Sequence, residues 1–414
     1  MKFKWHPKSK PSPVVAAIYE SIKVGDGSIG TTGMQADEDI AILASMLTTT
    51  QGRTDLDKVR LIWDAIASTK APSDESALLE TINAQAAARR GKRREKFTFI
   101  SSLSVARGWA PASIKVDDLT VRFFKNGLPR RYASRIDVTR DVIKWGHISP
   151  NPESYCYIAI NVEAKNHTEA FELATRELDL LRGALCWLAN PQVEQILLGS
   201  EYKPVNVVRS GSFHTLHEAS GKVATSTLMY EPNHSPANLY SHSDPKRFFR
   251  SLKIILSKLR EKAYSGRLAD ALIRFTKAFD EADADMAFVK GWSALESLLS
   301  STRADYPALV RRCTFLYADR AYHEAVISQL VEHRNSSVHR VSDGTLSRLF
   351  CYRLQGFFRV ALKFHLANQK HFQGFDEAMH FLDGPHTREE LDRRMALAML
   401  ARSFLDNPAK PPTG

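Results

Sequence analysis

The sequence predicts an α+β protein with a helical N-terminal segment, an α+β middle domain, an all-α antiparallel helical bundle and a C-terminal helix with a tail. Three observations lead to this prediction. Apolar residues recur at three- and four-residue spacing up to residue 96 and again after residue 242, which is typical of amphipathic helices. Between these regions, apolar and polar residues alternate in segments rich in β-branched and aromatic side chains, as in strands. The length of 414 residues is sufficient for two or three domains.

The N-terminal segment spans residues 1–96. Residues 1–13 are expected to form a flexible arm. The stretches DEDIAILASMLTTT and LDKVRLIWDAIAST predict amphipathic helices. The basic run ARRGKRREK, residues 88–96, is expected to be a solvated linker at a domain boundary, with RNA contact as the alternative.

The middle domain spans residues 97–242. FTFISSLSV, SIKVDDLTVRFF and SYCYIAINVEA predict strands, and GLPRRY predicts a turn. A long helix is expected to follow, with Asn166 or Thr168 as its N-cap. QVEQILLGS, PVNVV and VATSTLMY are candidates for further strands. The residues assign no chemistry to this domain, because it contains no Gly-rich phosphate loop and no catalytic signature. A role in sensing or target binding is kept for it as a hypothesis.

The predicted bundle spans residues 243–370 and contains several long segments with an apolar stripe. Their short connections favour antiparallel neighbours. The remaining part, residues 371–414, predicts one more helix, REELDRRMALAMLARSFL, followed by a disordered tail.

Charge and cysteine content restrict the class of protein. The net charge of +11 favours an anionic partner through long-range attraction. The 4 cysteines form no CxxC pair, so neither a disulfide framework nor a zinc site is expected, which fits a reducing cytosol. The basic start lacks the apolar segment of a signal peptide, and no apolar run is long enough to span a membrane. We therefore expect a cytoplasmic protein without a cofactor.

One short stretch, VEHRNSSVHR at residues 331–340, combines the side chains that handle phosphate. A histidine can take the proton from a ribose 2′-OH, because its pKa lies near neutrality. An arginine can bind two phosphate oxygens at once and stabilise charge in the transition state. These roles fit Arg334 and His339, with Asn335 in support, whereas His333 and Arg340 flank them as candidate phosphate contacts. An ordinary solvated helix end is the alternative.

The same stretch resembles the motif of the HEPN superfamily, particularly its ApeA-like C-terminal branch. Arg334-Asn335-Ser336-Ser337-Val338-His339 matches the pattern R-N-x-x-x-H. The upstream segment GWSALESLL, residues 291–299, is similar to the W-x-A-L-E-x-L-L helix of such domains. The resemblance covers roughly residues 245 to 370, less than a third of the chain.

The resemblance implies a helical bundle that pairs as a homodimer and cuts RNA without a metal. Arg334, Asn335 and His339 would be catalytic, and both copies would line one cleft. Many such proteins act in prokaryotic antiviral defence or abortive infection by cutting tRNA or other RNA, so a phage-derived trigger is a further expectation. Other members have lost activity and serve only in dimerisation or in RNA or protein binding, which is the alternative function.

Two further readings stay open. Glu296, between the apolar residues of its predicted helix, is a candidate partner for Arg311 or Arg334, against a solvated position. The stretch GDGSIGTTGMQADEDIAIL, residues 25–43, resembles the G-S…D-x-D pattern of minimal nucleotidyltransferases, in which Gly27 and Ser28 would cradle phosphate and Asp37 and Asp39 would hold magnesium. The competing reading is a Gly-rich loop that leads into an amphipathic helix.

Overall fold

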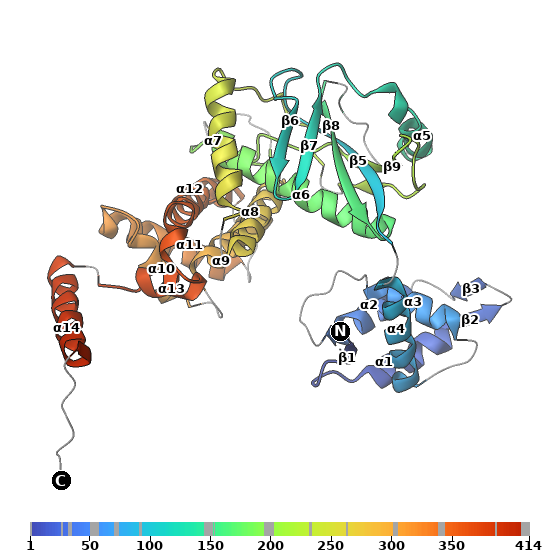
Figure 1. Cartoon of the computed structure of the whole chain (residues 1–414), viewed down its shortest axis with the longest axis horizontal. Coiled ribbons are helices and arrows are strands. Elements are labelled where there is room, and N and C mark those ends of the chain that lie inside the picture. The colour runs from blue at the N-terminus through green and yellow to red at the C-terminus, as the bar shows by residue number, and fades with distance from the viewer. Residues whose placement is uncertain are drawn as a thin grey trace, which may run out of the picture. The chain divides into compact units, whose positions relative to one another are not determined.

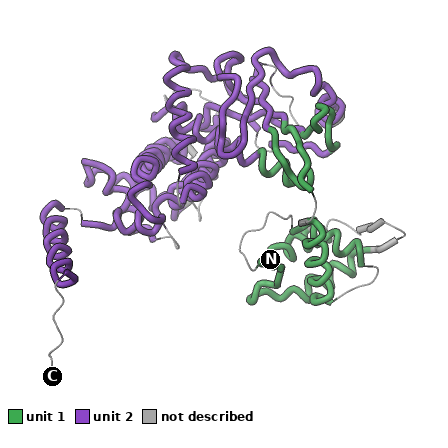
Figure 2. Tube along the Cα trace, in the orientation of Figure 1, with its two compact units in different colours: residues 1–99, 161–174, 216–226 green, residues 100–160, 175–215, 227–414 purple. Residues whose placement is uncertain are grey.

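The computed structural model describes most of the chain (Figure 1): residues 2–25, 28–31, 35–49, 58–69, 74–90, 93–144, 152, 154–193, 203–231, 234–261, 264–300, 305–337, 344–385 and 387–406. The chain divides into two compact units (Figure 2), of which the first comprises residues 1–99, 161–174 and 216–226. The second contains residues 100–160, 175–215 and 227–414. It combines most of the predicted middle domain with the predicted bundle, and the four-part division of the sequence stays a prediction.

The N-terminal part of the first unit is helical, as predicted. Helices α1 (Pro11–Ser21), α2 (Gln35–Met46), α3 (Lys58–Ser68) and α4 (Glu75–Arg90) surround one apolar core. A hairpin of β2 (Ile22–Gly25) and β3 (Ser28–Thr31) follows α1.

The prediction that residues 1–13 form a flexible arm is wrong. Strand β1 (Phe3–Trp5) pairs antiparallel with β4 (Leu47–Thr49), and Phe3 is only 2% exposed. The backbone N–H of Phe3 donates to Asn83 Oδ1 at 2.7 Å, and its carbonyl accepts from the Asn83 amide at 3.1 Å. The buried phenyl ring and these two bonds fix residues whose basic neighbours suggested a solvated arm.

A six-stranded sheet follows, in the order β10-β9-β5-β8-β7-β6. Its strands are β5 (Glu95–Leu103), β6 (Ser113–Val116), β7 (Leu119–Phe124), β8 (Cys156–Ala164), β9 (Phe213–Glu218) and β10 (Met229–Tyr230). The three predicted strand segments are confirmed, and SIKVDDLTVRFF turns within itself at Asp117, where φ is 43°. PVNVV is not a strand, and only the end of VATSTLMY enters the sheet.

Helices accompany the sheet. The 3-10 turn η1 (Arg130–Tyr132) and helix α5 (Arg135–Lys144) lie between β7 and β8 in the chain. The predicted long helix is α6 (His167–Ala189), and Asn166 Oδ1 accepts a hydrogen bond from the Glu169 N–H at 2.9 Å. Asn166 is thus the cap that the sequence suggested.

The helical region after residue 244 is also confirmed. It contains α7 (Pro245–Lys258), α8 (Ser265–Phe279), α9 (Ala284–Leu299), α10 (Tyr306–Thr314), α11 (Arg320–Ser337), α12 (Gly344–Asn368), the 3-10 turn η2 (Gln369–His371), α13 (Phe375–Leu382) and α14 (Arg388–Asp406). Helix α9 packs against α8, α10, α11 and α12, which makes it the centre of the bundle. Trp292 on α9 belongs to the core of the bundle, because it is only 1% exposed.

Buried polar side chains connect α6 to the bundle inside the second unit. The Arg182 guanidinium bonds Asp179 Oδ1 at 3.0 Å and Asp280 Oδ2, after the end of α8, at 2.5 Å. The Asn206 side-chain amide donates to the Thr276 carbonyl at 2.7 Å, and Asn190 donates to Gln355 Oε1 on α12 at 2.7 Å. Buried polar groups without such partners would destabilise the fold, so these bonds specify how α6, α8 and α12 meet.

The class is therefore a mixed α+β fold, while the antiparallel HEPN arrangement of the bundle stays a prediction. Across the described ranges, no helix has the length and apolarity needed to cross a membrane.

Candidate functional site

Helix α11 carries the first half of the VEHRNSSVHR stretch. It begins at Arg320 and ends at Ser337, so His333, Arg334 and Asn335 lie in its last two turns. His339 and Arg340 lie outside the described residues. The structure therefore places three of the five predicted site residues, and these three face in different directions.

His333 faces the core. Its side chain lies between Phe288 and Phe350, with ring centroids at 4.8 Å and 4.9 Å, and the residue is 8% exposed. Its Nε2 shares a hydrogen bond of 2.8 Å with Ser347 Oγ on α12. Burial lowers the pKa of His333, and Asp285 opposes this shift only in part. The imidazole fastens α11 to α12, and this placement does not suit the phosphate contact expected from it.

Arg334 lies at the edge of the bundle. The residue is half-buried, and its Cζ lies 5.4 Å from the ring centroid of Tyr306, the first residue of α10. A guanidinium over an aromatic ring is attracted to it by a cation–π interaction, which uses none of its N–H groups as hydrogen-bond donors. Among the described carboxylates, none forms an ion pair with Arg334. Asn335, the next residue of the helix, is exposed.

Tyr306 is a site residue that the sequence reasoning missed. Its ring lies edge-on to Trp292 at 6.1 Å, which fixes the ring beneath the Arg334 guanidinium. Burial raises the pKa of Tyr306, with Arg334 lowering it and Glu296 raising it, so all three side chains share one environment. The only signal in the sequence is an aromatic residue between the N-cap Asp305 and Pro307, which marks a helix start and not a partner for Arg334.

Glu296 does not pair as suggested. Arg311 bonds Asp383 Oδ1 at 3.0 Å instead, so the first predicted pairing is wrong. Among the described residues, Glu296 forms no ion pair with Arg334 either, and its buried Oε1 has no hydrogen-bond partner. A buried carboxylate oxygen without a donor is unfavourable, and it leaves one acceptor beside Tyr306.

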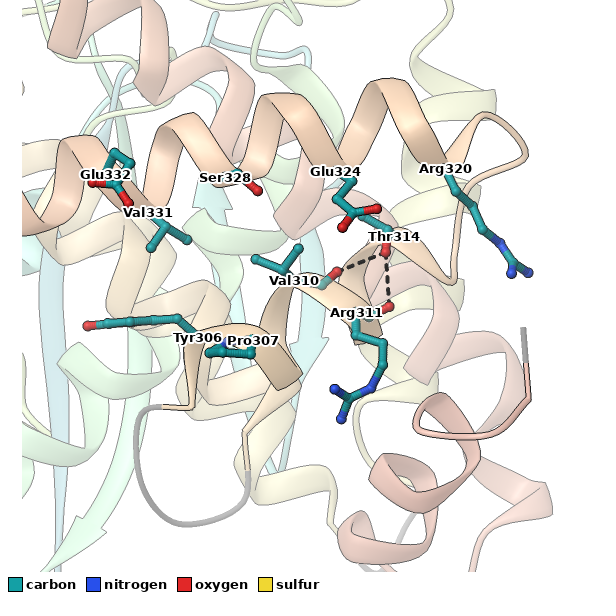
Figure 3. A pocket seen from close by; sticks show the side chains of 10 residues that line it. All are labelled: Tyr306, Pro307, Val310, Arg311, Thr314, Arg320, Glu324, Ser328, Val331 and Glu332. Atoms are coloured by element: carbon teal, nitrogen blue, oxygen red, sulfur yellow. Dashed lines mark hydrogen bonds between the residues drawn. The ribbon is translucent and has the colours of Figure 1, made fainter. Parts of the chain in front are cut away.

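A groove of about 630 Å³ runs between α10 and α11 (Figure 3). Tyr306 and Glu332 lie toward one end of it, and Arg311 and Arg320 lie toward the other. The lining is completed by Pro307, Val310, Thr314, Glu324, Ser328 and Val331. Because Tyr306 belongs both to the groove and to the cation–π pair, the groove leads to Arg334.

The stretch that is similar to a nucleotidyltransferase site forms a hairpin and a helix. Ser28 begins β3, and Asp39 lies within α2, as the competing helical reading predicted. Within the described part of the chain, no group of three or more His, Cys, Asp or Glu side chains is placed to hold a metal ion. Gly27 lies outside the described residues.

Comparisons with models of protein families, with curated proteins and with solved structures found no match to this chain.

Proposed function

We propose that the protein is a metal-independent endoribonuclease of the HEPN type. The observation that supports this proposal best is the position of Arg334, half-buried over the Tyr306 ring at the end of a groove, with Asn335 exposed beside it. Such a guanidinium is oriented by the ring and available to a phosphate. The resemblance of R-N-x-x-x-H to the HEPN motif adds His339 as the second catalytic residue.

The proposed reaction is transfer of the ribose 2′-oxygen to the adjacent phosphorus. His339 takes the 2′-OH proton, the 2′-oxygen bonds phosphorus, and the bond from phosphorus to the 5′-oxygen breaks. A second imidazolium, from His339 of the other copy in a homodimer, gives its proton to the leaving 5′-oxygen. Arg334 stabilises the negative charge on the phosphoryl oxygens, and Asn335 hydrogen-bonds one of them. The products carry a 2′,3′-cyclic phosphate and a 5′-hydroxyl.

The substrate class in this proposal is RNA, including tRNA, and the net charge of +11 supports an anionic partner. The process would be antiviral defence or abortive infection in the prokaryotic cytoplasm, with a phage-derived trigger. These assignments follow from the HEPN resemblance.

The test is a cleavage assay in EDTA with purified full-length protein, total RNA and tRNA. We expect Arg334→Ala and His339→Ala each to reduce cleavage by about 100-fold or more. Arg250→Ala on α7 and His380→Ala on α13 are matched controls, because both residues are exposed and belong to other helices. These controls should cleave as the wild type does.

Cleavage that survives in both site variants would contradict the proposal and indicate a contaminating nuclease. RNA that stays intact with wild-type protein but is bound by it would favour the non-catalytic HEPN module. RNA ends that a phosphatase can dephosphorylate directly would contradict a cyclic phosphate product.

A further inference from the structure

Helix α14 has no packing partner within the described part of the chain. It contains 19 residues, none of which is buried, and Met399, Phe404 and Leu405 are 72%, 68% and 82% exposed. An isolated helix of this length is only marginally stable in water. Exposed large apolar side chains over most of one helix are typical of an interaction surface.

The groove between α10 and α11 has the apolar lining and the length to receive such a helix. Pro307, Val310 and Val331 contribute its apolar surface. Arg320 and Glu332, at opposite ends, are 12 residues apart on α11, which corresponds to about 18 Å along its axis. Helix α14 is longer, at about 28 Å for its 19 residues.

The charges on α14 follow the same spacing as those on α11, with opposite signs. The groove residues Arg320, Glu324 and Glu332 are separated by four and eight residues. The α14 residues Glu390, Arg394 and Arg402 are separated by four and eight residues as well. If the two helices run parallel, opposite charges lie at equal heights along the axis. If the two helices ran antiparallel, Arg402 would lie opposite Arg320 and the like charges would repel. The order of the charges therefore favours the parallel arrangement.

The point of attachment of α14 favours the groove of its own chain. Asp383, directly after α13, bonds Arg311 at 3.0 Å and Arg312 at 2.6 Å, and Arg311 lines the groove. Residues 383–387, which separate α13 from α14, can span at most about 17 Å. This short tether holds the acidic start of α14 near the arginine end of the groove and gives it a high effective concentration there.

We propose that α14 docks into the α10–α11 groove of its own chain, parallel to α11, with Glu390 toward Arg320 and Arg402 toward Glu332. The docked helix ends beside Tyr306 and therefore beside Arg334. Its regulatory consequence rests on the proposed function: the docked helix covers the approach to Arg334, and RNA must displace it.

The docking is tested by hydrogen–deuterium exchange of the full-length protein at several concentrations. Wild-type α14 should be protected to the same degree at every concentration. Arg394→Glu with Arg402→Glu should accelerate its exchange about tenfold, because attraction becomes repulsion at two positions. Glu324→Arg with Glu332→Arg should do the same, and all four changes together should restore protection. Arg388→Glu with Arg393→Glu has the same charge change at other positions and should leave protection near the wild-type level.

An unprotected α14 in the wild type would overturn the proposal, and so would the absence of rescue in the fourfold variant. Protection that disappears on dilution together with a dimer would assign the groove to α14 of a second copy and overturn docking within one chain. Exchange does not depend on catalysis, so failure of the cleavage assay leaves this result unaffected. If both proposals hold, the two α14 substitutions increase RNA cleavage.

Discussion

Replacing Gly183 by alanine tests how closely α6 and α8 approach each other. A Cβ at residue 183 would lie 2.5 Å from Thr276 Oγ1, 2.8 Å from Leu272 Cγ and 2.9 Å from the Leu272 carbonyl oxygen. Two of these atoms cannot move freely, because Thr276 Oγ1 donates to the Asp179 carbonyl at 3.1 Å and the Leu272 oxygen belongs to the α8 backbone. The helices must therefore separate, or the hydroxyl must lose its bond.

The substitution Gly183→Ala is expected to lower the free energy of unfolding, because its costs exceed its gain. Alanine stabilises a helix interior by about 1 kcal/mol relative to glycine. Overpacking costs about 1–3 kcal/mol, and loss of the Thr276 hydrogen bond costs about 1 kcal/mol. We expect Gly183→Ala to lower the free energy of unfolding by about 1–3 kcal/mol.

Gly356→Ala is the matched control, because residue 356 lies inside α12 and its added Cβ would meet no atom within 4 Å. This variant should be stabilised by about 1 kcal/mol. Thermal unfolding followed by circular dichroism separates the two, since each kcal/mol shifts the melting temperature of a unit of this size by about 1–2 °C. A Gly183→Ala protein as stable as the Gly356→Ala protein would refute the close approach of α6 and α8.

Three further predictions follow from single contacts. Tyr306→Leu should reduce RNA cleavage about two- to fivefold, because it removes the aromatic ring under Arg334. Tyr306→Phe keeps the ring and should cleave as the wild type does. An equal loss in both variants would show that the ring is not the group that matters. Burial lowers the pKa of His365 to about 4. As the pH falls, the imidazole therefore takes up a proton in the unfolded chain before it does so in the folded chain. The free energy of unfolding should fall by up to about 3 kcal/mol between pH about 6.5 and pH about 4. His365→Phe should flatten that dependence in denaturant titrations, and an unchanged slope would contradict it. Arg312→Met should lower the free energy of unfolding by about 1–3 kcal/mol, because Asp383 loses its bond of 2.6 Å, and an unchanged melting temperature would contradict this role.

Local patterns predicted the elements well where one segment determines its own structure. The Asn166 cap lies directly before its helix, and α9 to α12 follow from their apolar stripes. The β9 strand was not predicted, because its histidines, His214 and His217, are polar by composition yet fully buried in the fold. His214 bonds Ser101 Oγ at 2.8 Å, a partner 113 residues away that no local pattern identifies.

Some residues of the candidate site could likewise be predicted from local sequence, and others could not. The sequence identified Arg334 and Asn335 by residue type, and both are at least partly exposed. It grouped His333 with them because the three are adjacent, but neighbouring residues on a helix point about 100° apart, and His333 packs on Phe288 and Phe350. Tyr306 lies 28 residues before Arg334 and could be found only through the packing of α10 on α11.

The polar contacts of Asn190 and Asn206 have a practical consequence for dissecting the protein. A fragment that starts at residue 243 would contain α8 and α12 but neither asparagine. It would leave Gln355 without the amide that bonds it and expose the α8 surface that receives Asn206. Such a fragment is expected to aggregate, whereas a fragment that starts at Glu95, the first residue of β5, would retain both side chains and the whole strand.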